Sequence, residues 1–204
     1  MQSDYAVLGR ATAQARGPHQ ATTDESLIQS IAGGDKRAMQ VLFARHNVRV
    51  YRFVMRLVGD AALAEDLVSE VFLEVWRKAG RFEGRSQVST WLLAIARYKA
   101  ISQLRNRSVD QLDEQMAETI EDPADNPEEI VAKMDRGAIM RKCLTELSPA
   151  HREIIDLVYY HEKSMEEVAR IMQVPEGTVR TRMFYARKRL AELLRAHGID
   201  RGDR

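Results

Sequence analysis

Cysteine, aromatic residues and long hydrophobic runs are all scarce in this sequence of 204 residues. Its single cysteine, Cys143, cannot form an internal disulfide, which favours a reducing compartment, and we expect Cys143 in the core of its helix. No run approaches about 18 apolar residues and the N-terminus lacks an apolar signal core, which predicts a soluble, cytoplasmic protein without membrane insertion. Aromatics make up only 6% of the residues, while Leu, Ala, Arg and Glu are abundant, a mixture that favours helix over sheet.

Motifs for catalysis are missing as well. The sequence has no phosphate-binding glycine loop and no nucleophile motif, and its five histidines are scattered without the spacing of metal ligands. We therefore expect no enzyme, no cofactor and no metal site. The formal net charge of +1 gives no sign of a nucleic-acid partner for the whole chain, but this average conceals a strong asymmetry along it.

Apolar residues at helical spacing divide the first half of the chain into four expected helices. The first is short and ends at Gly33-Gly34, and it follows a tail over residues 1–23 that we expect to be disordered. The others are predicted over residues 35–58, about 61–79 and about 89–106, the last with Ser89 as its N-cap.

An acidic stretch then separates two domains. Residues 109–135 contain ten acidic residues and a single cation, Lys133, together with two prolines. This composition predicts a linker between a first domain at 24–108 and a second domain at 136–197. No strand pattern is present, so we predict an all-α protein of two small helical domains joined by an acidic flexible linker.

The second domain contains the pattern of a helix-turn-helix. We predict a helix over 139–147, a second from Ser148-Pro149 to Tyr160, and a third opened by a capping box at 164–167. A turn over 173–176 with a proline leads into a last helix from about Gly177 to about Ala196.

Short helix, tight turn and longer helix have the spacing of a DNA-binding motif. Ala169 is small enough to allow the two helices to cross closely, and the last helix has no acid between Gly177 and Arg189. Its first turns carry Glu176, Thr178, Arg180 and Thr181, which can reach base edges, and its later cations suit phosphates. The alternative is an ordinary helical hairpin with a solvated basic face.

A second cluster of positive charge lies over residues 77–108, where eight cations accompany one acid, Glu83. Phe82, Trp91 and Tyr98 are interleaved with these cations. Cations beside aromatic rings suit single-stranded DNA, whose bases stack and whose phosphates attract Lys and Arg. Taken singly, aromatic residues such as Phe82 and Trp91 are more often core residues than base-stacking ones.

The helix predicted over 61–79 places polar groups beside an apolar stripe, at Glu65, Asp66, Ser69 and Glu70. Alone, this pattern indicates only a solvated helix face.

Six segments taken together resemble the extracytoplasmic-function branch of the sigma-70 family of bacterial sigma factors. In the first domain they are 64–72 (AEDLVSEVF), 89–92 (STWL) and 95–97 (IAR), and in the second 147–149 (LSP), 167–169 (EVA) and 177–182 (GTVRTR). The sequence departs from the family at three positions: Ser69 stands where Gln is usual, Tyr98 where Asn is common, and Ser102 where Asp is common.

The resemblance implies a transcription initiation factor that binds core RNA polymerase and directs it to promoter DNA. Region two, here 24–108, would bind the clamp helices of the largest polymerase subunit and open the minus-ten element. Region four, here 136–197, would bind the polymerase flap and read the minus-thirty-five element, while the acidic linker would thread the polymerase interior. An anti-sigma factor is the expected regulatory partner.

Residue roles follow from the same resemblance. The implied polymerase-binding residues are Asp66, Leu67, Ser69 and Glu70. The implied minus-ten residues are Arg81, Phe82, Arg85, Ser86, Trp91, Arg97, Tyr98, Lys99 and Arg105. The implied minus-thirty-five residues are Glu176, Thr178, Val179, Arg180, Thr181, Arg182, Arg187 and Lys188.

Two other classes of protein remain open at this point. A stand-alone DNA-binding regulator would use the helix-turn-helix but leaves the basic cluster at 77–108 and the acidic linker unexplained. A sigma-like decoy that sequesters an anti-sigma factor would need no DNA-reading cations, yet the last helix retains them.

Overall fold

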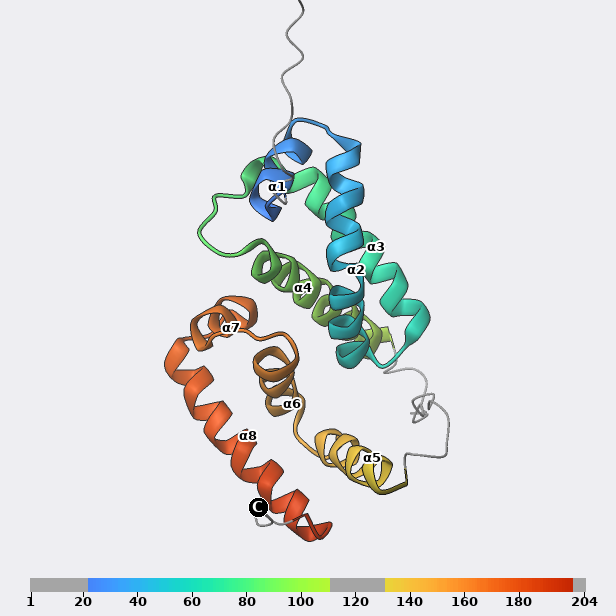
Figure 1. Cartoon of the computed structure of the whole chain (residues 1–204), viewed down its shortest axis with the longest axis vertical. Coiled ribbons are helices and arrows are strands. Elements are labelled where there is room, and N and C mark those ends of the chain that lie inside the picture. The colour runs from blue at the N-terminus through green and yellow to red at the C-terminus, as the bar shows by residue number, and fades with distance from the viewer. Residues whose placement is uncertain (1–21, 111–130, 200–204) are drawn as a thin grey trace, which may run out of the picture.

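The computed structural model describes residues 22–110 and 131–199, and within these ranges it contains eight α-helices and no strand (Figure 1). The all-α prediction is confirmed for this part of the chain. Most of the expected N-terminal tail and of the acidic linker lies outside the described residues. Helices α1–α4 form one group and α5–α8 a second, which lies below it in Figure 1.

The first group consists of α1 (Asp24–Ala32), α2 (Lys36–Val58), α3 (Ala61–Lys78) and α4 (Val88–Asp110), with a short 3₁₀ turn, η1 (Ala79–Arg81), after α3. Helices α2, α3 and α4 pack against one another, and α1 lies across α2. Asp35 and Asp60 cap α2 and α3 by accepting hydrogen bonds from backbone N–H groups of the first turn. These caps explain why the predicted boundaries of α2 and α3 are confirmed within one or two residues.

The start of α4 was predicted wrongly. The helix begins at Val88 instead of after Ser89, because Val88 is buried in the core and the Gln87 carbonyl accepts hydrogen bonds from the N–H groups of Thr90 and Trp91, both at 3.1 Å. Ser89 therefore lies in the first turn and is not the N-cap. The helix also continues to Asp110, beyond the predicted end.

The second group consists of α5 (Val131–Thr145), α6 (Pro149–Ile155), α7 (Met165–Met172) and α8 (Glu176–Ala196). Helix α5 begins earlier than predicted, since residues 131–135 were counted with the linker although three of them, Ala132, Lys133 and Met134, are good helix formers. The helix after Ser148 was predicted as one piece, but α6 changes at Asp156 into a π turn, η3 (Asp156–Tyr160). Cys143 is fully buried, as predicted.

The helix-turn-helix is confirmed. Ser164 and Glu167 form the predicted capping box of α7, and Gln173 adopts a left-handed conformation with φ of 56° to make the turn. Helix α8 begins at Glu176, one residue before the predicted start, with Pro175 at its N-cap. Helices α5, α6 and α7 all pack against α8.

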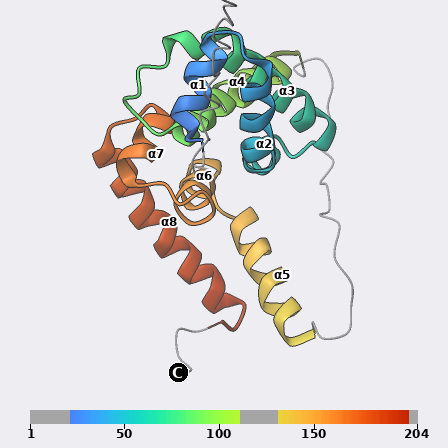
Figure 2. The same ribbon diagram turned by 45° about the horizontal axis from the view of Figure 1, so that its top comes forward.

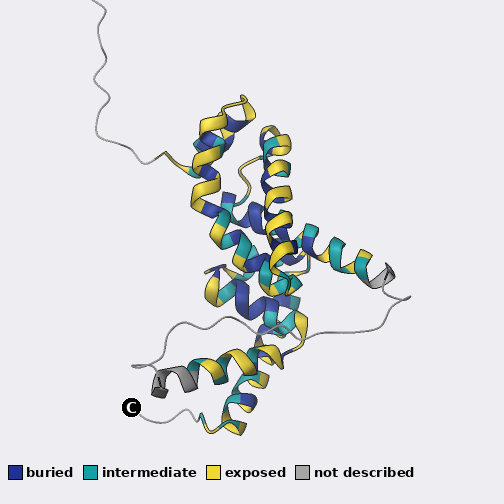
Figure 3. Cartoon of the chain, turned by 90° about the vertical axis from the view of Figure 1, so that its right-hand side faces the viewer, coloured by how far each residue is buried: buried dark blue, intermediate teal, exposed yellow. Residues whose placement is uncertain are grey.

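Buried apolar side chains line the inner faces of both groups, as the dark blue segments of Figure 3 show. Within the described residues, no helix is long and apolar enough to cross a membrane. The two groups also contact each other, because α7 packs on α4 (Figure 2). This contact determines which of the expected functional residues are accessible.

Candidate nucleic-acid interface

The acidic face of α3 is exposed as expected, with one exception. Asp66, Ser69 and Glu70 are on the surface, but Leu67 is only 3% exposed and belongs to the core. Leu67 therefore supports the helix from inside and cannot be a surface contact, which corrects that part of the prediction. The Glu70 carboxylate is 2.9 Å from the Lys99 ammonium of α4.

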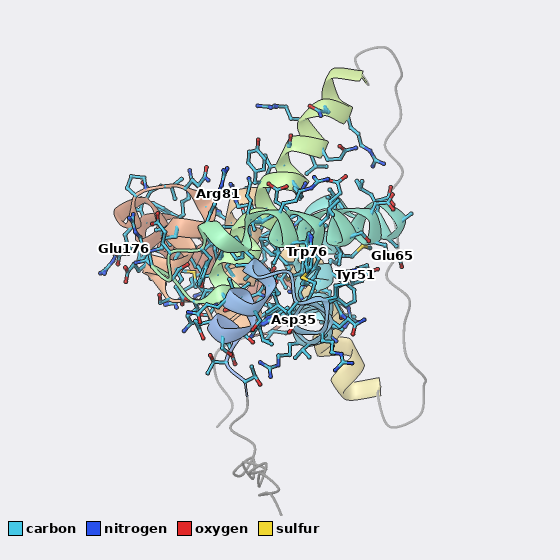
Figure 4. The ribbon with its side chains drawn as sticks, turned by 90° about the horizontal axis from the view of Figure 1, so that it is seen from above. Asp35, Tyr51, Glu65, Trp76, Arg81 and Glu176 are labelled. Atoms are coloured by element: carbon cyan, nitrogen blue, oxygen red, sulfur yellow. The ribbon has the colours of Figure 1, made fainter. Side chains whose placement is uncertain are left out.

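Beside this acidic face, the structure contains an apolar groove that the sequence reading missed. The groove has a volume of about 360 Å³ and is lined by residues of α2 and α3: Phe43, Asn47, Val48, Tyr51, Glu65, Val68 and Ser69. Phe43 fits the apolar helical spacing of residues 35–58, yet it is 41% exposed and packs at the edge, 4.8 Å from the ring of Phe72 between centroids. Figure 4 shows Tyr51 and Glu65 on this side of the molecule, away from Glu176.

The position of Val48 in the sequence could have indicated this groove. This residue is apolar but lies outside the periodic stripe of α2, and it is 55% exposed. An apolar side chain outside the core stripe and next to a polar helix face is typical of a contact surface.

The aromatic residues of the basic cluster divide into two kinds. The rings of Phe82 and Trp91 pack against each other at 5.1 Å between centroids, and both are partly buried against the core. Tyr98 is 69% exposed on α4, two turns after Trp91. Of the three aromatics named from sequence, Tyr98 is thus the one whose ring is free to stack on a base.

The positive charge of residues 77–108 is largely balanced in the folded chain. Five of its cations form ion pairs, namely Lys78 with Glu74, Arg85 with Glu83, Arg97 with Glu153, Lys99 with Glu70 and Arg107 with Asp60. Four of those five acids lie outside the segment, so the count of charges along the sequence could not include them. Arg81 and Arg105 are exposed, and Ser86 is half-buried.

Arg97 is held by the second helical group. Its Nε donates a hydrogen bond of 2.6 Å to Glu153 Oε1, and its Nη2 is 3.4 Å from Glu153 Oε2. Glu153 belongs to α6 and is only 7% exposed. The contact is the two-point geometry that an arginine also makes with a phosphate.

A buried lysine fixes the same contact nearby. Lys163 is 5% exposed, and its ammonium lies 2.7 Å from Ser89 Oγ, 3.0 Å from Thr90 Oγ1 and 3.2 Å from Glu167 Oε1. Thr90 itself donates to Glu167. These four residues join the start of α4 to the start of α7.

Burial and hydrogen bonding shift the pKa values of Lys163 and Glu167. Burial lowers the pKa of Lys163, and the hydrogen bond and charge of Glu167 oppose that shift. Burial alone would raise the pKa of Glu167, but hydrogen bonds from Thr90, from the Ser164 N–H and from Lys163 outweigh it and bring the pKa to about 2. Glu167 is thus ionised at neutral pH.

A second contact joins α2 to the π turn. The rings of Phe53 and His161 meet edge to face at 5.3 Å, and Arg56 pairs with Asp156. His161 is 3% exposed, and its Nε2 lies 3.3 Å from Asp156 Oδ2. Burial, followed by the charges of Arg49, Arg56 and Lys163, lowers the pKa of His161 to about 4.

The basic helix α8 presents most of its expected residues to solvent. Arg180, Thr181, Arg187 and Lys188 are exposed, and Glu176, Thr178 and Arg182 are half-buried. Val179 is completely buried and holds α8 against the domain, which corrects its place among the expected contact residues.

Two pairs of side chains on α8 contact each other at its surface. Glu176 Oε1 is 2.6 Å from Arg180 Nη2, which fixes the guanidinium in the first turns of the helix. Phe184 and Tyr185 are 64% and 54% exposed and pack edge to face, an exposed aromatic pair that was not predicted from the sequence.

Family models match both helical groups. The model of sigma-70 region 2 matches residues 42–109, and the model of sigma-70 region 4 matches residues 143–192.

Curated relatives cover nearly the whole chain. RNA polymerase sigma-H factor of Pseudomonas aeruginosa is 31% identical over 182 residues, which is 84% of this chain and 93% of that protein. ECF RNA polymerase sigma factor SigL of Mycobacterium tuberculosis is 29% identical over 85% of this chain and 98% of that protein.

Two solved structures have a similar fold. One is the sigma factor RpoE in complex with the anti-sigma factor NepR from Bartonella quintana, with 28% identity, a TM-score of 0.63, and coverage of 76% of this chain and 96% of that one. The other is CnrH in complex with the cytosolic domain of CnrY, with 24% identity, a TM-score of 0.62, and coverage of 85% and 97%.

Proposed function

This chain belongs to the extracytoplasmic-function branch of the sigma-70 family, and on that premise we propose which of its surfaces meet polymerase and which meet DNA. As a member of the family it is a transcription initiation factor that binds core RNA polymerase and directs it to promoters. The observation that carries this conclusion is the order of two matched regions on two helical domains, the first with an acidic helix face and the second with a basic helix-turn-helix.

The polymerase surface of the first domain consists, in this proposal, of the exposed acids of α3 and the neighbouring apolar groove. Asp66 and Glu70 lie four residues apart and share one helix face. The groove at Phe43 and Val48 adds exposed apolar area beside that charge, the combination from which tight protein interfaces are built. Their expected partner is the pair of clamp helices of the largest polymerase subunit.

The minus-ten surface runs along the start and the exposed face of α4. Tyr98 offers its ring to an unpaired base, and Arg81, Arg97, Lys99 and Arg105 offer charge to phosphates. Opening the duplex costs a few kcal/mol per extruded base, and stacking on an exposed ring offsets part of that cost.

The minus-thirty-five surface lies along α8, from Glu176 to Lys188. Arg180 and Thr181 lie where a recognition helix enters the major groove, and Lys188 lies two turns further along, where such a helix meets phosphates. The second domain is also expected to contact the polymerase flap.

Regulation by an anti-sigma factor is part of the proposal. The similar RpoE structure was solved with the anti-sigma factor NepR, which supports a partner of that class for this chain. We expect the chain to act in the cytoplasm, where polymerase and promoter DNA are, and to contribute no catalytic group of its own, since polymerase performs the chemistry.

Run-off transcription with core polymerase and genomic DNA tests the function. Transcripts with discrete start sites are expected only when the chain is present. A stand-alone regulator would bind DNA without starting transcripts, and a decoy would do neither.

Charge reversal tests the polymerase surface. Asp66→Lys should abolish pull-down of core polymerase with unchanged helicity, and Glu70→Gln should weaken it. Glu70 is changed to Gln because a lysine there would face Lys99. The matched control reverses Glu25, which is exposed on α1, and should leave binding intact. Full binding by Asp66→Lys would contradict the proposed surface.

A further inference from the structure

The second domain covers part of the surface that the first domain offers to DNA. Besides the contact at Lys163, Arg170 of α7 donates a hydrogen bond of 2.7 Å to the carbonyl of Arg85, in the segment that leads into α4. Arg85, Ser89, Thr90 and Arg97 are therefore all in contact with α6, α7 or the turn between them. We call this set of contacts the docking interface.

Within the docking interface, Glu153 occupies the place of a phosphate. Its two carboxylate oxygens meet the Arg97 guanidinium at 2.6 and 3.4 Å, and the side chain of Arg97 is 22% exposed. The contact takes two of the five N–H donors of the guanidinium, the pair on its Nε–Nη2 edge, so a phosphate cannot use that edge for a two-point contact while Glu153 holds it. Since Glu153 is itself buried, the pair is shielded from solvent screening more than a surface pair is.

We propose that the free chain is autoinhibited by this contact: the second domain docks on the first, and Glu153 masks Arg97 from DNA until the domains separate. The inference rests on the proposed function, in which Arg97 contacts the minus-ten element. It is consistent with the promoter geometry, since two elements about two helical turns apart are separated by roughly 70 Å and cannot be read by domains in direct contact.

The mask predicts that the free chain gains affinity for single-stranded DNA when Glu153 is changed. Binding of the full chain, without polymerase, to a labelled oligothymidine is measured by fluorescence anisotropy at several salt concentrations. Glu153→Gln should bind at least roughly 5-fold more tightly than the unchanged chain, the lower end for coupling between two sites. The slope of log affinity against log salt should steepen by about 0.7, the value for one more phosphate contact on a single strand.

Two comparisons separate the mask from a simple change in net charge. Glu192→Gln removes the same charge from an exposed residue that pairs only within α8, with Arg189, and should leave affinity unchanged. Arg97→Ala combined with Glu153→Gln should lose the gain. Glu153→Asp retains the charge but is too short for the two-point contact, and it too should bind more tightly; it provides the test should Glu153→Gln reduce helicity.

The outcomes distinguish the mask from the function. If Glu153→Gln, or Glu153→Asp where Gln disturbs folding, binds no better than Glu192→Gln, the mask is refuted. A mask that is real should also disappear in holoenzyme, where both variants should bind a promoter fork equally. If the unchanged holoenzyme fails to bind or open any promoter, the proposed function is refuted, whatever the free chains do.

Discussion

Replacement of Lys163 by methionine tests whether the docking interface holds the two domains together. The methionine stem fills the same space but donates no hydrogen bond, so Ser89 Oγ, Thr90 Oγ1 and Glu167 Oε1 lose a partner at 2.7, 3.0 and 3.2 Å. Removing one partner of a buried ion pair commonly costs about 3–5 kcal/mol. Burial already lowers the pKa of Lys163, which shows that part of this energy is spent on desolvating the ammonium.

Ser89, Thr90 and Glu167 can also return to water when the domains separate, so the loss of docking free energy should not exceed about 3 kcal/mol. We therefore expect a loss of about 2 kcal/mol in docking, or roughly a 30-fold shift toward separated domains. The assay is energy transfer between dyes at Gln40→Cys and Ala196→Cys, both exposed, while the native Cys143 is fully buried. Transfer should fall in Lys163→Met and stay constant in Lys188→Met, an exposed control.

The result that would refute this reasoning is a lower melting temperature with unchanged energy transfer. Lys163 and Glu167 are four residues apart and also pair within the second domain. That result would mean that the lysine stabilises the start of α7 and contributes nothing to docking.

Three further predictions concern single side chains. Burial lowers the pKa of His161 from 6.5 to about 4, so the docked state favours the neutral imidazole. Docking should therefore be fully stable above pH 6.5 and weaken as the pH falls toward 4, by about tenfold at pH 5.5. Energy transfer in His161→Leu should lack this pH dependence. Arg180→Ala should relax sequence preference at one or two positions of the upstream element by about 1–3 kcal/mol. Lys188→Ala should instead weaken binding to all single-base variants of the DNA alike and reduce the slope of log affinity against log salt by about one. Equal losses of affinity for every DNA variant with Arg180→Ala would make Arg180 a phosphate contact. Tyr98→Ala should weaken holoenzyme binding to a pre-opened bubble template by about 1–3 kcal/mol in a competition assay, and an unchanged bubble affinity would remove Tyr98 from the minus-ten surface.

Features set by neighbouring residues could be predicted from the sequence. The caps at Ser148 and Ser164 act on N–H groups three residues away, so residue type and spacing were sufficient to find them. The cap predicted at Ser89 failed because the start of that helix is not decided by its neighbouring residues alone. Its position depends on burial of Val88 in the core, which is a tertiary contact and invisible to a local pattern.

Features set by distant residues could not be predicted. The basic cluster at 77–108 has a formal charge of +7 along the sequence, yet Arg97 and Lys99 are balanced by Glu153 and Glu70. Phe82 and Trp91 pack partly into the core for an equally non-local reason. A charge count along a segment is thus an upper bound on the charge that its surface offers to DNA.

The two balanced cations of α4 differ in what can release them. Arg97 is paired across the domain contact, so separation of the domains is sufficient to free it. Lys99 is paired within the first domain with Glu70, on the proposed polymerase surface, and domain separation leaves that pair intact. An interaction of Glu70 with polymerase would compete for the carboxylate and so make Lys99 available. On the proposed assignments, both cations become free together only after polymerase has bound and the domains have parted, which places polymerase binding before promoter opening.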